Sequence, residues 1–146
     1  MKIAIATDHN GVKEKEIIIK EFEELYDIID LSPNNTSTDD YPLYAFTVAD
    51  YVKNNENTLG ILLCGTGIGM SIAANKVKGI RCAHVSNINE AKLAKFHNNA
   101  NIIAMSYKND INEIIKCINM FLITDFAEEE RHIRRINMIT EYEREN

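Results

Sequence analysis

The chain has 146 residues, of which 45% are hydrophobic and 26% are charged, and its formal net charge is −6. This composition fits one globular domain with a proper core. No basic run or stripe is present, which argues against nucleic acid as a partner, and the longest apolar stretches are too short to cross a membrane.

Strand-like apolar runs alternate with longer helix-like segments along the chain. In chain order we expect a strand at 2–7, a helix at 12–25, a strand at 26–31, a turn-rich loop at 32–40, a helix at 43–53, a strand at 59–64, a helix from about 67 to 76, a strand at 80–85, a helix at 87–97, a strand at 101–105, and helices at 110–123 and 129–144. Such alternation requires crossover connections. It predicts an α/β protein with a parallel sheet and helices on both faces, in a single domain spanning 1–146.

The cysteines bear on location and metal content. Cys64, Cys82 and Cys117 are odd in number and far apart, with no Cys-x-x-Cys pair or Cys/His cluster. This pattern disfavours both a disulfide framework and a structural zinc site. A strand-like run begins at residue 2, too early for a secretory signal, so we expect a cytoplasmic protein.

Polar residues follow two of the predicted strands directly. Asp8 and His9 follow the first strand, and Cys64 ends the third. Ligands of open parallel sheets bind outside the carboxyl ends of the strands, so these residues belong on one edge. Two interpretations of Asp8 and His9 are open, namely an ordinary turn in which Asp8 caps the next helix and a pair of site residues.

Three glycines at spacing two, Gly65, Gly67 and Gly69, separate the third strand from the next helix. Met70 stands where a dinucleotide fingerprint would have its third glycine, and no Gly-Lys-Ser/Thr of a phosphate loop follows. One interpretation is a tight turn that needs glycine for close packing. The other is a cradle of backbone amides for an anion, either a phosphate or an enediolate oxyanion.

Cys64 stands directly before this loop. A cysteine at the end of a buried strand is usually a small hydrophobic residue. Nearby amides and a helix N-terminus, however, favour the thiolate, which is a base or a nucleophile. Cys82 and Cys117 lack such a setting and are expected in the core.

His97 presents a geometric problem. At the end of a helix it suits the helix dipole, with asparagines as a C-cap. It also precedes the fifth strand, so it lies at the sheet edge opposite Cys64. If the two residues act together, the simplest arrangement is a two-fold dimer with a shared site.

Arg131 and Arg135 are four residues apart and share a helix face. Two guanidiniums on one face suit a phosphate dianion. The alternative is a solvated face balanced by the acidic residues at 128–130.

Six motifs occur in a specific order: Asp-His-x-Gly after the first strand, Thr-Asp-x-Tyr-Pro near residue 40, Cys-Gly-Thr-Gly-Ile-Gly with Ala-Ala-Asn-Lys, Gly-Ile-Arg at 79–81, His-Asn-x-x-Asn, and Arg-His-x-x-Arg. Each is weak alone, but the ordered set covers essentially the whole chain. By these motifs the chain resembles the type B ribose-5-phosphate isomerases, a group that also includes galactose- and allose-6-phosphate isomerases.

The resemblance implies a Rossmann-like α/β/α sandwich with five parallel strands and a C-terminal helix. It also implies a metal-independent aldose–ketose isomerisation through an enediolate, without a cofactor. The implied partners are a sugar phosphate and a second copy of the chain, in a homodimer with shared sites or a tetramer of paired dimers.

The resemblance also assigns roles by position. Cys64 is the base, Thr66 hydrogen-bonds the reacting oxygens, and His97 opens the sugar ring with Asp8 assisting. The remaining residues contact the substrate: the backbone of Gly65, Gly67, Ile68 and Gly69 stabilises the enediolate, His9, Arg131 and Arg135 bind the phosphate, and Tyr41 and Asn98 line the sugar pocket.

The chain departs from the family pattern at three places, and the last of them bears on phosphate affinity. Asn99 stands where many relatives have aspartate, Asp39 is an extra residue within its motif, and Glu129-Glu130 replaces the usual Gly-Gly before Arg131. Met70 stands where one branch has a catalytic glutamate, which places the chain in the cysteine branch. A six-carbon sugar phosphate as substrate, and a non-catalytic sugar-phosphate-binding protein, remain alternatives to ribose 5-phosphate isomerisation.

Overall fold

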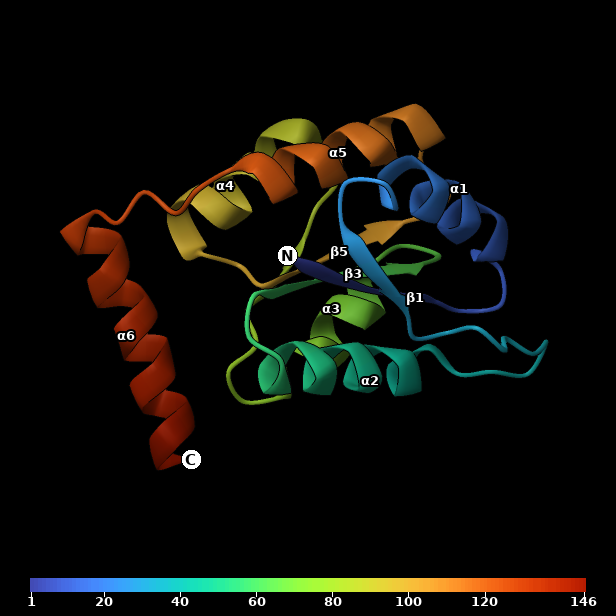
Figure 1. Cartoon of the computed structure of the whole chain (residues 1–146). Helices are drawn as coiled ribbons and strands as arrows, with labels where there is room; N and C mark the ends of the chain where they lie inside the picture. Colours follow the sequence, from blue (N-terminus) through green and yellow to red (C-terminus); the bar gives the residue numbers. More distant parts are fainter.

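The protein is built on a five-stranded, fully parallel sheet with strand order β2-β1-β3-β5-β4 (Figure 1). The computed structural model describes residues 1–146. The strands are β1 (Lys2–Thr7), β2 (Asp27–Asp30), β3 (Thr58–Cys64), β4 (Cys82–His84) and β5 (Ile102–Ser106). The predicted fold class is confirmed.

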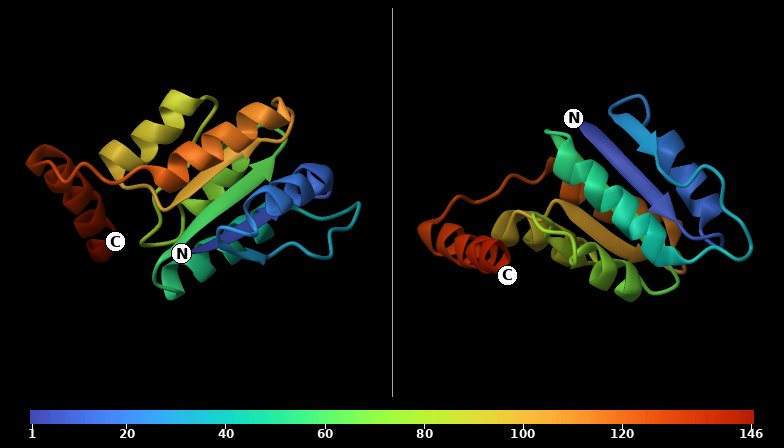
Figure 2. Two further views of the ribbon diagram at one scale, coloured as in Figure 1. Left: turned by 45° about the horizontal axis from the view of Figure 1, so that its top comes forward. Right: turned by 90° about the horizontal axis from the view of Figure 1, so that it is seen from below.

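Helices cover both faces of the sheet (Figures 1 and 2). They are α1 (Val12–Phe22), α2 (Tyr41–Asn54), α3 (Ile68–Ala74), α4 (Ile88–Asn98), α5 (Ile111–Ile123) and α6 (Glu130–Glu145). One face packs against α1, α4 and α5, and the other against α2 and α3. The result is a three-layer α/β/α sandwich.

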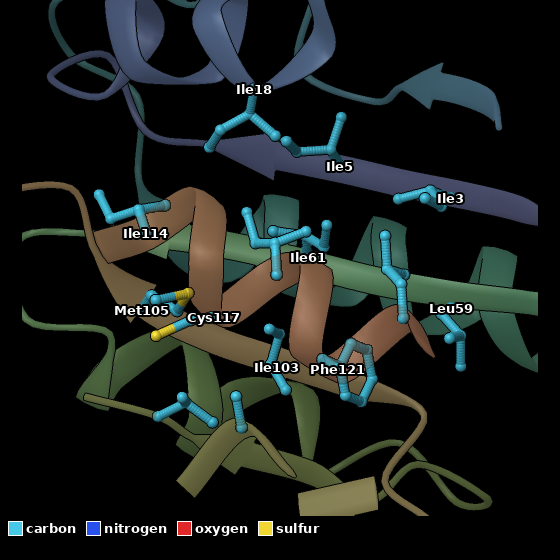
Figure 3. Packing of buried hydrophobic residues seen from close by; sticks show 14 of the residues in the cluster. Ile3, Ile5, Ile18, Leu59, Ile61, Ile103, Met105, Ile114, Cys117 and Phe121 are labelled. Atoms are coloured by element: carbon cyan, nitrogen blue, oxygen red, sulfur yellow. The ribbon is translucent and has the colours of Figure 1, made fainter. Parts of the chain in front are cut away.

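Successive strand residues point to opposite faces, so each strand contributes to two separate cores. In β1, Ile3 and Ile5 pack under α1 and α5, whereas Ala4 and Ala6 face α2 and α3. Figure 3 shows the first core, where Phe121 and Cys117 lie over the isoleucines of the sheet. The second core contains many alanines, which lets α2 and α3 approach the sheet closely, and it includes the side chain of Cys64.

The order in which strands are added to the sheet reverses at β1. β2 lies on one side of β1, and β3, β5 and β4 lie on the other. Loops leaving adjacent strands on the two sides of such a point diverge and leave a crevice at the carboxyl ends. Asp8 and Cys64 follow or end the two strands that flank it.

Several boundaries differ from the sequence expectation. The first helix ends at Phe22 instead of residue 25, and Leu25 lies outside it with 75% of its surface exposed. The second helix begins at Tyr41 instead of residue 43, because Pro42 fits the first turn of a helix, where no backbone N–H is needed. The fourth strand has only three residues, since β4 is an edge strand paired with β5 alone.

The C-terminal helix α6 stands outside the three layers, beyond the end of α4 (Figure 1). A hydrogen bond from Gly79 N to Glu143 Oε2 (3.0 Å) joins it to the turn before β4. Between them lies an open cavity of about 510 Å³, lined on the helix side by Met138, Ile139 and Tyr142. None of the helices is both long and apolar enough to span a bilayer.

Candidate active site

Cys64 lies at the end of β3 with 5% of its surface exposed, and its Sγ accepts a hydrogen bond from Gly67 N (3.1 Å). Gly67 has φ +81°, and a Cβ added there would lie 2.8 Å from the backbone of Met105. Only glycine therefore fits this position without strain. The sulfur therefore lies directly against a backbone amide that donates to it.

The rest of the glycine loop is fixed by neighbours on β4 and β5. Ser106 Oγ donates to Gly65 O (2.7 Å), and Nε2 of His84 lies 2.9 Å from Thr66 O. Thr66 Oγ1 accepts from Ile68 N (3.1 Å) in the first turn of α3, which leaves its hydroxyl proton free to donate. His84 belongs to the edge strand β4 and contacts the loop through this ring nitrogen.

Tyr41 lies over the same loop. A Cβ added at Gly69 would come within 2.4 Å of the Tyr41 ring, so the ring and the loop backbone are in direct contact. Tyr41 is 38% exposed and is the first residue of α2. The structure thus brings together, beside Cys64, the predicted site residues Tyr41, Gly65, Thr66, Gly67, Ile68 and Gly69.

Asp8 forms a local turn rather than a helix cap. Its Oδ1 accepts from Asn10 N (3.0 Å), and the N-cap of α1 is Gly11, without a side-chain cap. The capping interpretation of Asp8 is therefore wrong. The carboxylate lies at the carboxyl end of β1, which is the strand next to β3.

His9 is held by Asp39, thirty residues away in sequence. Asp39 Oδ1 accepts from the ring Nδ1 (2.7 Å) and from the backbone N (3.1 Å) of His9. Burial opposes ionisation of Asp39, but hydrogen bonds from Asn35, His9 and Tyr44 outweigh it and hold the pKa of this carboxyl well below its usual range. Asp39 is therefore a carboxylate at neutral pH.

Tyr107 is a residue of this edge that the sequence did not single out. Its backbone N donates to Cys64 O (3.1 Å), and its ring lies against Gly11. Its hydroxyl lies 3.6 Å from a Cβ added at Gly65. Burial and the Asp8 carboxylate raise the pKa of Tyr107, so the phenol remains protonated. Its only signal in the sequence is an aromatic residue directly after a strand.

His97 lies at the other end of the molecule. It is in the last turn of α4, and its ring stacks on that of His132 from α6, with centroids 4.5 Å apart. Burial and the neighbouring Arg131 lower the pKa of His132, which favours a neutral ring. The helix ends at Asn98, and its C-cap Asn99 has a left-handed conformation (φ 44°), which asparagine tolerates better than most residues.

Arg81 fixes the segment that follows His97. Its Nε donates to Asn98 O (2.9 Å), its Nη2 donates to Asn99 O (2.9 Å), and its backbone N donates to Asn101 Oδ1 (2.9 Å). The Gly-Ile-Arg motif thus positions the His-Asn-x-x-Asn motif, a role that the sequence did not reveal.

Arg131 and Arg135 of α6 are exposed, on the same helix as His132, whose ring stacks on His97. Arg131 Nε donates to Glu129 Oε2 (3.1 Å), and Arg135 lies one turn further along the same helix. Of the two residues that replace the Gly-Gly pair, Glu129 therefore engages a predicted phosphate ligand directly.

The predicted site residues thus form two groups at opposite edges of the sheet. Cys64 pairs with Ser106 at the carboxyl end of β5, whereas His97 and Asn98 precede its amino end. From Ile102 to Ser106, β5 rises about 13 Å. Within one chain, His97 cannot reach Cys64. No cluster of three or more His, Cys, Asp or Glu side chains could hold a metal ion.

A family model described as Ribose/Galactose Isomerase matches residues 3–139. The chain belongs to the ribose/galactose isomerase family. This confirms the family expected from the ordered motifs. A relative named probable ribose-5-phosphate isomerase B, from Mycoplasma genitalium, is 46% identical over 98% of this chain and 96% of its own. A putative sugar phosphate isomerase of Bacillus subtilis is 45% identical over 100% of this chain and 99% of its own.

Solved structures of ribose/galactose isomerase family members agree with the fold. Ribose-5-phosphate isomerase B from Mycoplasma genitalium with bound ribulose-5-phosphate matches with a TM-score of 0.93 and 44% identity, covering 99% of this chain and 97% of that one. The type B ribose 5-phosphate isomerase of Trypanosoma cruzi matches with a TM-score of 0.93 and 37% identity, covering both chains completely.

Proposed function

We propose that this protein interconverts ribose 5-phosphate and ribulose 5-phosphate, with Cys64 as the base. The observation that carries the proposal is the hydrogen bond of 3.1 Å from Gly67 N to Cys64 Sγ, which joins the thiol to an amide-rich loop. Ribulose-5-phosphate in the Mycoplasma genitalium relative supports a five-carbon substrate.

The chemistry requires a base and an anion cradle side by side. The Cys64 thiolate takes the proton from C2 of the open-chain aldose, and the C2–H electron pair forms the C1=C2 bond of the enediolate. Charge then gathers on O1, where loop amides and the Thr66 hydroxyl stabilise it. Return of the proton from sulfur to C1, with transfer of the O2 proton to O1, gives the ketose. A positioned general base contributes about 10²–10⁴ in rate, and a well-placed oxyanion donor about 10²–10³.

The second group of residues completes the site from a partner subunit in a homodimer. His97 opens the furanose ring together with Asp8 of the facing chain. Asn98 contacts the sugar from one side, and Tyr41 of the facing chain contacts it from the side of Cys64. Arg131 and Arg135 bind the phosphate together with His9 of the facing chain. The separation of His97 from Cys64 within one chain supports this arrangement.

Exposed apolar surface also supports the homodimer. Ile68 and Ile72 on α3 are 51% and 59% exposed, and Met138 and Tyr142 on α6 are 64% and 70% exposed. A second copy of the chain would bury such residues. Pairing of two dimers into a tetramer would bury further exposed apolar surface.

Three unpaired cysteines, all buried, support a reducing compartment, and we place the protein in the cytoplasm.

A substrate panel tests the activity. We expect kcat/KM to be highest for ribose 5-phosphate, measured by a coupled assay for ribulose 5-phosphate, and lower for allose 6-phosphate and galactose 6-phosphate. A preference for either six-carbon substrate would overturn the assignment. Binding of ribose 5-phosphate without turnover would instead indicate a non-catalytic sugar-phosphate-binding protein.

A further inference from the structure

Asp39 receives an unusual number of hydrogen bonds for one loop carboxylate. Its Oδ2 accepts from Asn35 Nδ2 (2.9 Å), Thr36 N (3.2 Å) and Tyr44 OH (2.9 Å). Its Oδ1 accepts only from His9, through the ring and the backbone. One oxygen therefore organises the 35–44 segment, and the other is dedicated to the histidine.

The segment that carries Asp39 is itself tied to the sheet. Asn35 Nδ2 also donates to Thr7 O (2.9 Å), at the end of β1. The Asp39 side chain is only 8% exposed, whereas that of His9 is 33% exposed. Asp39 is thus a rigid, buried anchor behind a histidine that faces outward at the edge where Cys64 lies.

We propose that Asp39 is the positioning residue that orients the His9 ring for the substrate phosphate. The tautomer of a histidine is set by the hydrogen bond that its other nitrogen makes. A ring that donates Nδ1–H to Asp39 presents Nε2, which has no partner within the protein, to the phosphate. When Nε2 also carries a proton, the ring donates from Nδ1 to Asp39 and from Nε2 to the phosphate, which makes the phosphate hydrogen bond charge-assisted.

This inference rests on the proposed function, because it assigns His9 to the phosphate. It adds a residue that acts through His9 and touches no substrate. Asp39 should therefore govern the affinity for substrate, and proton transfer at Cys64 should proceed largely without it.

Steady-state kinetics of Asp39→Asn test the role. We expect KM for ribose 5-phosphate to rise about tenfold, the scale of one charged hydrogen bond, with kcat changed less than about threefold. The matched control is Tyr44→Phe, which removes one bond to Oδ2 and leaves the His9 pair intact, so KM should stay within about twofold. An equal rise of KM in the two variants would show that Asp39 only stabilises its loop, and it would overturn the proposal.

A double variant separates orientation of His9 from general effects. Once His9→Asn has removed the ring, adding Asp39→Asn should change KM less than about twofold, because coupled residues are not additive. A full tenfold further rise would show that Asp39 acts independently of His9.

The tautomer itself is a readout that does not depend on turnover. In wild-type protein, ¹⁵N NMR of the imidazoles, with the His9 signal assigned by its loss in His9→Asn, should show His9 protonated at Nδ1. Addition of inorganic phosphate should shift its Nε2 signal. An Nε2–H tautomer in wild-type protein would overturn the inference even if Asp39→Asn failed to fold. Failure of the activity assay alone would contradict the proposed function and leave this result standing.

Discussion

At the scale of single residues, Glu129 pairs with Arg131, one of the two arginines that we propose bind the substrate phosphate. Its Oε2 accepts from Arg131 Nε at 3.1 Å, and both side chains are at least half exposed. Exposed ion pairs of this kind contribute about 0.2–1 kcal/mol. In its proposed role, Arg131 must release this carboxylate before a phosphate can take its place.

Glu129→Gln should therefore lower KM for ribose 5-phosphate by up to about fivefold, the upper limit of such a pair, with kcat nearly unchanged. Glu130→Gln is the matched control, because it makes the same change in net charge at a residue without an ion pair. If both variants lower KM equally, the effect is one of overall charge and not of the Glu129–Arg131 contact.

Asp39 also makes folding stability depend on pH. Because its pKa is depressed in the folded protein, it contributes stability above its unfolded value of about 3.9, and that contribution is lost as pH falls toward the folded value. Denaturant unfolding at pH 6 should show wild type more stable than Asp39→Asn, with the gap narrowing below about pH 4. A gap independent of pH would show that the charge of Asp39 does not matter.

The turn between β3 and α3 is the element on which the site depends. Gly67 has a positive φ and meets the Met105 backbone, whereas a Cβ added at Gly65 finds only the Tyr107 hydroxyl at 3.6 Å. The two glycines lie in one loop but have different structural requirements.

Gly67→Ala should therefore lower the free energy of unfolding by at least about 2 kcal/mol, since strain and overpacking combine. Gly65→Ala should change it by less than about 1 kcal/mol. Chemical denaturation of both variants measures the difference. Equal stabilities would mean that the loop can relax around a side chain at Gly67.

The sequence predicted the parallel sheet well because alternation of apolar runs is a local signal. It did not predict the strand order, which depends on pairing between distant strands, or the short β4, which depends on its edge position. Cys64 and its loop were recognisable because they are contiguous. The Asp39–His9 contact was not, because the two residues are brought together only by folding.

At the scale of the whole molecule, the predicted site residues lie at opposite ends of the parallel strands, which predicts that a dimer shares its active sites between subunits. Variants Cys64→Ala and His97→Asn, each expected to have low activity alone, should regain activity when mixed and allowed to exchange subunits. One of the two sites in a mixed dimer then carries both intact residues. Exchange verified by mass spectrometry with no recovery of activity would mean that each site is formed within one chain.

Proton transfer by the sulfur of Cys64 is tested most directly by the kcat of Cys64→Ala for ribose 5-phosphate. We expect kcat to fall by about 10²–10⁴, the contribution of a general base, while the melting temperature and the binding of inorganic phosphate stay close to those of wild type. A variant that folds, binds phosphate and retains near-normal kcat would show that Cys64 is not the base.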